Sequence, residues 1–254
     1  MLKSSLLAAV LIFATMPANA AQLKLLVGGS MQEPFREIGA DFSKQTGHKL
    51  DFTVDTTGAL QKHLRSGEKA DIILVSAPGM DALEKEHLIM PGTRVELANA
   101  AIGVSVRAGA AAPDISSPDA FKKAMLAAHS ISYVDPKSGG TSGGYLDGLF
   151  QRMGIADEVK KKVVFGYQGS QVADAVATGR AELGLTFISE MLPNKGVKIA
   201  GPLPAAIQSA TNYAVAIPVG SPNPEAARAF VQAMTTPAAK AAIIKAGLVP
   251  LSKP

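Results

Sequence analysis

Residues 23–30 read LKLLVGGS, a short apolar run that ends on two glycines and a serine. The run Leu23–Val27 is predicted to form a strand, and Gly28-Gly29-Ser30 the turn that follows it. From about Met31 to Thr46 the apolar residues Phe35, Ile38 and Phe42 recur at helical spacing. The stretch therefore predicts a strand, a glycine turn and an amphipathic helix.

The same alternation continues along the chain. Leu50–Val54 is predicted as a strand, Asp55-Thr56-Thr57-Gly58 as a turn and Ala59–Ser66 as a helix. Asp71–Val75 is nearly all apolar, which suits a buried parallel strand. A βαβαβ order predicts an α/β fold with a parallel sheet, in which ligands bind where strand ends meet helix starts.

A second set of elements begins after Ala98 with a strand predicted at 100–106. Its other elements are strands at 131–134, 163–165 and 183–187 and helices at about 142–153 and 172–178. No internal repeat of fixed period links the two sets. We expect the second set to form a lobe of its own.

A final strand at 213–218 precedes two closing helices, which start near Asn223 and Thr236. These helices have no sheet of their own, so we expect them to pack on the first lobe. This arrangement predicts two α/β lobes, one of residues 21–98 plus 213–254 and one of residues 99–212.

The first twenty residues predict export. Lys3 supplies a positive start, Leu6–Met16 is too short to span a bilayer, and Ala18-Asn19-Ala20 is a signal-peptidase pattern. We expect cleavage after Ala20, a periplasmic mature chain and no membrane insertion of that chain.

Composition excludes several classes of protein. The chain has no cysteine, which excludes disulfides and thiolate chemistry. Without Lys3, 25 − 1 = 24 basic residues face 21 acidic ones, and they are scattered apart from Lys160-Lys161-Lys162. We predict no nucleic-acid partner, a monomer, and neither a metal nor another cofactor, since the histidines lack metal-site spacing and no phosphate-binding lysine motif occurs.

Three hydroxyl residues lie at or beside predicted helix starts: Ser30, Thr57 and Ser142. Free N–H groups and the helix dipole favour an anion there. Each residue alone could be an ordinary N-cap. Because all three follow strand ends and lie among glycines that permit close backbone approach, the pattern predicts one shared site for a small anion, either a tricarboxylate or an oxyanion.

The motifs together resemble those of the periplasmic molybdate-binding proteins of ABC importers. The matching segments, in family order, are LLVGGS (25–30), TGAL (57–60), ADII (70–73), Asp135-Pro136 with Gly143 and Tyr145, GRAELG (179–184) and NPEAA (223–227). The resemblance covers nearly the whole mature chain. It implies a two-lobed type II periplasmic binding protein, a ligand cleft between the lobes and an ABC permease as a possible partner.

The resemblance also implies ligand-binding residues. With their glycine and hydroxyl neighbours these are Ser30, Thr57, Gly58, Ser138, Thr141, Ser142, Gly143, Val172 and Phe187. Phe187 stands where the family has a tyrosine, so one phenolic donor is missing. The loop 135–145 is also longer than in the family and reads KSGGTSGG over 137–144. Both departures favour an organic polyanion over molybdate.

A branch of this family isomerises cis- and trans-aconitate, which requires a group that moves a proton at carbon. The candidate proton carriers are Glu33, Lys137 and Tyr145. Glu33 is also at capping-box spacing from Ser30, and Tyr145 could belong to the core. Glu190 is interpreted as a helix-start charge. The sequence leaves two functions open, an aconitate isomerase and a solute-binding receptor without catalysis.

Overall fold

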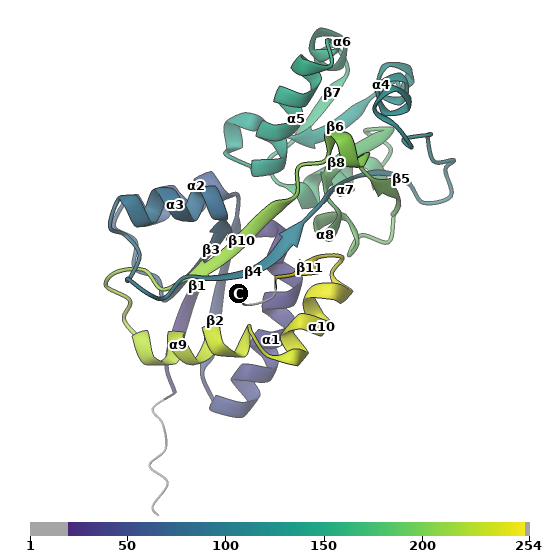
Figure 1. Cartoon of the computed structure of the whole chain (residues 1–254). Coiled ribbons are helices and arrows are strands. Elements are labelled where there is room, and N and C mark those ends of the chain that lie inside the picture. The colour runs from purple at the N-terminus through teal and green to yellow at the C-terminus, as the bar shows by residue number, and fades with distance from the viewer. Residues whose placement is uncertain (1–19, 252–254) are drawn as a thin grey trace, which may run out of the picture.

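The computed structural model describes residues 20–251. Two lobes, each a sheet flanked by helices, are joined by crossing segments near the middle of the molecule (Figure 1). The predicted leader falls on residues 1–20, of which 1–19 lie outside the described residues.

The first lobe is built on a six-stranded sheet of order β11-β4-β10-β3-β1-β2. Its strands are β1 (Gln22–Gly28), β2 (Lys49–Asp55), β3 (Ile72–Ser76), β4 (Val95–Ala100), β10 (Thr211–Ala216) and β11 (Val249–Pro250). β1 pairs in parallel with β2 and β3, and β10 runs antiparallel between β3 and β4. The carboxyl ends of β1, β2 and β3 therefore meet at one edge of this sheet.

Helices cover both faces of the first sheet (Figure 1). They are η1 (Gly29–Met31), α1 (Gln32–Thr46), α2 (Thr57–Arg65), α3 (Ala77–Lys85), α9 (Pro224–Ala233) and α10 (Pro237–Lys245). The closing helices α9 and α10 contact α1, as the sequence predicts. The Phe230 ring lies 5.7 Å from that of Phe35 and 5.2 Å from that of Phe42, and Lys245 pairs with Glu37.

The second lobe is built on a five-stranded sheet of order β7-β6-β8-β5-β9. Its strands are β5 (Ile102–Arg107), β6 (Ile131–Val134), β7 (Val163–Gly166), β8 (Leu183–Phe187) and β9 (Val197–Pro202). Its helices are α4 (Pro118–Ala127), η2 (Pro136–Ser138), α5 (Thr141–Arg152), α6 (Ala156–Lys160), α7 (Gly169–Ala177), α8 (Ile188–Met191) and η3 (Ala205–Ile207). β6, β7 and β8 are parallel, so their carboxyl ends also share an edge.

The strand predicted at 100–106 corresponds to β5, but it begins at Ile102, and a separate strand, β4, was not predicted. The chain forms β4 up to Ala100 and β5 from Ile102, and the two strands belong to different sheets. Residues 95–100 (VELANA) mix polar and apolar side chains, so an apolar run alone does not reveal β4. The exact lobe boundaries near 98 and 213 stay a prediction, with β4 and β10 both in the first sheet.

The two crossing segments are hydrogen-bonded to each other. The Gln208 amide accepts from the Ile102 N–H at 3.1 Å and donates to the Ile102 carbonyl at 2.8 Å. The Asn99 side chain donates to that of Asn212 at 2.8 Å. These contacts keep the crossings side by side where the lobes join.

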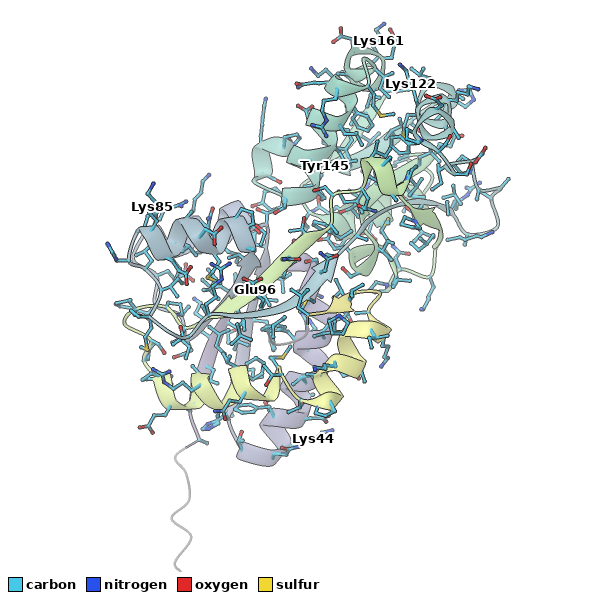
Figure 2. All side chains as sticks on the ribbon, viewed as in Figure 1. Lys44, Lys85, Glu96, Lys122, Tyr145 and Lys161 are labelled. Atoms are coloured by element: carbon cyan, nitrogen blue, oxygen red, sulfur yellow. The ribbon has the colours of Figure 1, made fainter. Side chains whose placement is uncertain are left out.

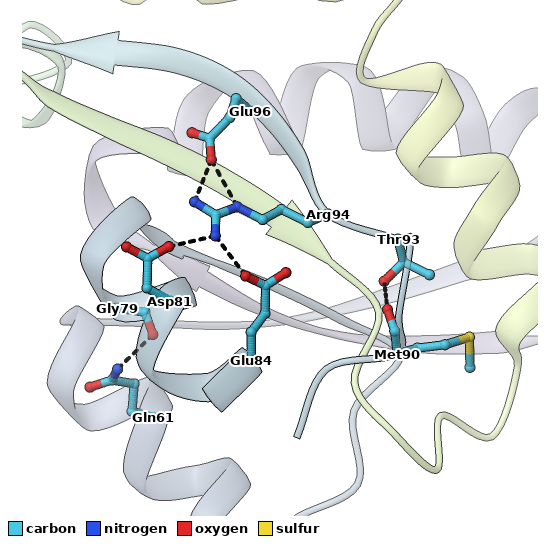
Figure 3. Close-up of polar contacts among 8 residues, drawn as sticks. All are labelled: Gln61, Gly79, Asp81, Glu84, Met90, Thr93, Arg94 and Glu96. Carbon is cyan, nitrogen blue, oxygen red and sulfur yellow. Dashed lines mark hydrogen bonds and ion pairs between the residues drawn. The ribbon is translucent and has the colours of Figure 1, made fainter. Parts of the chain in front are cut away.

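Arg94 forms an ion cluster in the first lobe, between α3 and β4 (Figure 3). Its guanidinium donates to Asp81 at 2.6 Å, to Glu84 at 2.7 Å and, through two nitrogens, to Glu96 at 2.9 and 2.6 Å. Desolvation lowers the pKa of Arg94, but the three carboxylates raise it by more, so its pKa lies above the ordinary value. The cluster fastens α3 to the edge of the sheet.

None of the helices in residues 20–251 combines the length and apolar character needed to cross a membrane. Lysines labelled in Figure 2, Lys44 and Lys85 on the first lobe and Lys122 and Lys161 on the second, lie at the periphery of the two lobes. These four lysines therefore lie away from the junction, whereas Lys62, His63 and Lys137 line a hollow that also includes Ser138.

Candidate functional site

A small cavity of about 20 Å³ lies between the lobes, where strand ends of both sheets meet helix starts. Its lining residues are Gly28, Gly29, Asp55, Thr56, Thr57, Val134, Gly140, Thr141, Ser142, Gln168, Gly169, Phe187, Glu190 and Tyr213. Among these described residues there is no lysine, arginine or histidine. The cavity therefore offers an anion hydroxyls and backbone N–H groups rather than a fixed positive charge.

Two hydrogen bonds hold the lobes together beside this cavity, and we call them the latch. The Thr56 hydroxyl donates to the Ser138 carbonyl at 2.6 Å, and the Gly58 N–H donates to the Gly139 carbonyl at 3.1 Å. A Cβ on Gly58 would lie 2.9 Å from the Gly139 Cα. Gly139 has a φ of +78°, which also favours glycine. The glycines allow the two backbones to touch.

Three hydroxyl groups from distant parts of the chain, those of Ser30, Thr141 and Tyr213, lie close together at the cavity. Ser30 is 2% exposed, and its Oγ lies beside the Tyr213 hydroxyl without a hydrogen bond of ordinary geometry. Desolvation and the Glu190 carboxyl raise the pKa of Tyr213, while the neighbouring Ser30 and Thr141 hydroxyls act against that rise. A buried hydroxyl without a partner is costly, so Ser30 is suited to hydrogen-bond a ligand.

Tyr213 is a site residue that sequence reasoning missed. It lies on β10, and its ring packs edge-on against Phe187 with centroids 5.9 Å apart. Phe187 has no phenolic hydroxyl, but Tyr213 places one beside the Phe187 ring, from a strand of the other lobe. The available signal was a tyrosine at the start of the strand that returns to the first lobe.

Glu190 is the second residue that sequence reasoning missed. It lies in the first turn of α8, as interpreted, and it also lines the cavity between the lobes. The side chain is partly exposed. Desolvation raises the pKa of Glu190 to about 7, although hydrogen bonds from Thr186 and Phe187 act to lower it. The Thr186 hydroxyl donates to Oε2 at 2.6 Å. No lysine, arginine or histidine within residues 20–251 forms an ion pair with Glu190.

Several predicted ligand-binding residues meet at this site. Thr57, Thr141, Ser142 and Phe187 line the cavity, Ser30 lies next to Tyr213, and Gly58 and Ser138 form the latch. Thr56 rather than Thr57 is the N-cap of α2, accepting from the Ala59 N–H.

Two predicted ligand-binding residues lie elsewhere. Val172 is buried against Gly166 and Gly184, because α7 begins at Gly169, earlier than the sequence predicts, and presents Gln168 and Gly169 to the cavity instead. Gly143 packs α5 so closely on β6 that a Cβ there would overlap the Val134 carbonyl. Neither residue lines the cavity.

The three predicted proton carriers also lie off the cavity. Glu33 and Lys137 are exposed, and neither is among the cavity-lining residues. The Tyr145 hydroxyl donates to the Ile207 carbonyl at 2.6 Å, and its ring packs under the Arg152 guanidinium. Tyr145 therefore anchors the second crossing segment to α5 in the upper lobe (Figure 2).

Comparison with known proteins identifies the family. Residues 23–249 match the bacterial extracellular solute-binding protein family. The chain belongs to that family. Within residues 20–251 no group of three histidine, aspartate or glutamate side chains could hold a metal ion.

Two sequence relatives and one solved structure are similar to nearly the whole chain. It is 35% identical over 251 residues to a protein named aconitate isomerase from a Pseudomonas species, covering 95% of this chain and 94% of the relative. It is 28% identical over 229 residues to the molybdate-binding protein ModA of Azotobacter vinelandii, covering 87% of each. The solved structure of the Azotobacter vinelandii periplasmic molybdate-binding protein matches with a TM-score of 0.75 at 20% identity, covering 91% of this chain and 100% of that one.

The chain is therefore a ModA-like solute-binding protein with the type II periplasmic binding protein fold. The predicted α/β fold class and the predicted family are both confirmed.

Proposed function

We propose that this protein binds a small polycarboxylate between its lobes and interconverts cis- and trans-aconitate. The observation that carries the proposal is the makeup of the cavity: hydroxyls and helix starts suited to an anion, together with the Asp55 and Glu190 carboxyls and no basic side chain among the described lining residues. The 35% identity to a protein named aconitate isomerase supports the same reaction.

The Glu190 carboxyl in this anion site favours a ligand that can give a proton to a carboxylate and take it back. A fully ionised oxyanion is stabilised only by hydrogen-bond donors. It repels a neighbouring carboxylate unless that carboxylate is protonated. A polycarboxylate with carbon-bound hydrogens can instead use a carboxyl that gains and loses a proton near neutral pH.

Binding requires the lobes to move apart first. The cavity of about 20 Å³ is smaller than a tricarboxylate, and the latch closes it on one side. Opening the latch costs two hydrogen bonds, which are regained when the lobes close again on the ligand.

A receptor without catalysis is the second candidate function. It is favoured by the 28% identity to a molybdate-binding protein and by a latch that would signal closure to an ABC permease. This function needs fit and release but no acid–base group.

The mature chain, residues 21–254, tests both functions in one set of measurements. We expect cis-aconitate at 100 times its dissociation constant to stabilise the fold by about 2.7 kcal/mol and molybdate to have little effect, read as the shift in melting temperature. Incubation with cis-aconitate, followed by chromatography, should yield trans-aconitate. Binding of aconitate without interconversion would favour the receptor, and stabilisation by micromolar molybdate alone would contradict the proposal.

A further inference from the structure

Glu190 occupies a special position between two hollows. Besides the cavity it lines an outer groove of about 290 Å³, whose other lining residues include Gln32, Ser170, Ser189 and the acidic residues Glu33 and Asp174. Gly29, Gln168 and Glu190 line both hollows. A ligand that extends from the cavity toward the groove would pass in front of the Glu190 carboxyl.

The surroundings of Glu190 orient it for this role. Thr186 holds Oε2 at 2.6 Å, and the Ser142 hydroxyl lies 3.3 Å from that of Thr186. The other oxygen, Oε1, points toward Gly29, where an added Cβ would lie 2.7 Å away, and a Cβ on Gly169 would overlap the carboxyl. Glycines at the starts of η1 and α7 therefore leave space for this carboxyl.

Two buried hydroxyls near the cavity and the groove, those of Ser30 and Ser189, lack hydrogen-bond partners within the described residues. Ser30 Oγ is next to Tyr213 at the cavity, and Ser189 belongs to the groove lining. Both residues are less than 5% exposed. A bound ligand can supply the hydrogen-bond partner that each of these hydroxyls lacks.

We propose that Glu190 is the catalytic residue that carries the proton between the two allylic carbons of aconitate. This inference rests on the proposed function. In the carboxylate form, Glu190 accepts a proton from the methylene carbon of the substrate, and the C–H electron pair enters the allylic system. Glu190 then returns the proton to the former vinylic carbon, where a C–H bond forms as the double bond shifts. No oxidant, reductant or water is consumed, and the carboxylate is regenerated.

The remaining groups stabilise the intermediate charge. The allylic anion spreads onto the substrate carboxylates, where the Ser30, Thr141 and Tyr213 hydroxyls can donate hydrogen bonds. A pKa of about 7 keeps a substantial fraction of Glu190 ionised at neutral pH, which suits a general base. Glu33, by contrast, is exposed on the rim of the groove.

The test compares the unmutated mature chain with Glu190→Gln, which keeps the shape and removes the proton-carrying oxygen. Aconitate affinity is measured by calorimetry, interconversion by chromatography, and exchange of the methylene hydrogens by NMR in D₂O. We expect Glu190→Gln to bind aconitate within about threefold of the unmutated chain and to lose interconversion and exchange by roughly 10²–10⁴-fold. Glu37→Gln, which removes an exposed carboxylate of α1 that pairs with Lys245, is the control and should keep both rates.

Glu190→Asp covers the case in which the glutamine variant fails to fold. It keeps a carboxyl but withdraws it by one methylene, so the rate should fall at least tenfold while binding remains. An active unmutated chain whose folded Glu190 variants keep their rates would overturn the role of Glu190 alone. An unmutated chain with no interconversion would overturn the proposed function, and this inference with it.

Discussion

Glu96 in the first lobe and Glu190 in the cleft are both partly enclosed carboxyls, but they have opposite surroundings. Glu96 accepts two hydrogen bonds from Arg94, which also holds Asp81 and Glu84 (Figure 3). Glu190 has only the Thr186 hydroxyl and a backbone hydrogen bond from Phe187, with no basic partner in the described structure. Arg94 thus neutralises the Glu96 carboxylate where it holds α3 against β4, whereas no basic side chain of the described structure neutralises Glu190 at the cavity.

The largest expected effect follows from leaving Glu190 unpaired. Since its pKa is about 7 in the folded chain and ordinarily 4.5, the folded state retains a proton that the unfolded state releases between those values. Stability should therefore fall as pH rises from about 4.5 to 7, by at most about 3 kcal/mol. Glu190→Gln should remove this part of the pH dependence and be more stable than the unmutated chain at pH 8, measured by urea unfolding across pH. Equal stabilities at pH 8 would contradict it.

Removing the cation from the Arg94 cluster should destabilise the fold, whereas removing the charge of Glu190 should stabilise it at pH 8. Arg94→Met leaves three carboxylates facing one another, so we expect a loss of about 2 kcal/mol in the free energy of unfolding at pH 7. The matched control is Arg65→Met, which removes only an exposed pair with Glu86 and should cost under about 1 kcal/mol. Similar losses for the two variants would show that the cluster is no stronger than a surface ion pair.

The smallest effect concerns the latch and should appear in binding alone. Gly58→Ala places a methyl group 2.9 Å from the Gly139 Cα, so it should oppose closure and weaken aconitate binding about tenfold, or 1.4 kcal/mol. Stability should not fall, because alanine favours the helix. Gly144→Ala in α5 meets nothing within 4 Å and serves as the control in the same calorimetric titration. Unchanged affinity for Gly58→Ala would mean that the liganded lobes do not use this contact.

Local signals predicted much of the fold and part of the site. The apolar run Leu23–Val27 and its glycine turn correspond to β1 and η1, and the hydroxyls at helix starts led to Thr57 and Ser142 in the cavity lining. These features depend on neighbouring residues in the chain, so a single sequence reveals them.

The remaining site residues depend on long-range packing. Glu190 meets Gly29 because α8 packs on η1, and Tyr213 reaches Ser30 and Thr141 because β10 returns between β3 and β4. Nothing beside Glu190 in the sequence distinguishes a cleft carboxyl from a solvated one. Tyr145, predicted as a proton carrier, instead donates to a backbone carbonyl that only the folded chain brings near it.

The central claim is that Glu190 is a carboxyl without a positive partner that exchanges its proton near neutral pH. It is tested most directly by a ¹³C NMR titration of the glutamate side-chain carboxyls of the mature chain, with the Glu190 signal assigned by its loss in Glu190→Gln. The account predicts a midpoint at about pH 7 for this one signal. A Glu190 signal that titrates at the ordinary pKa of 4.5 would contradict it.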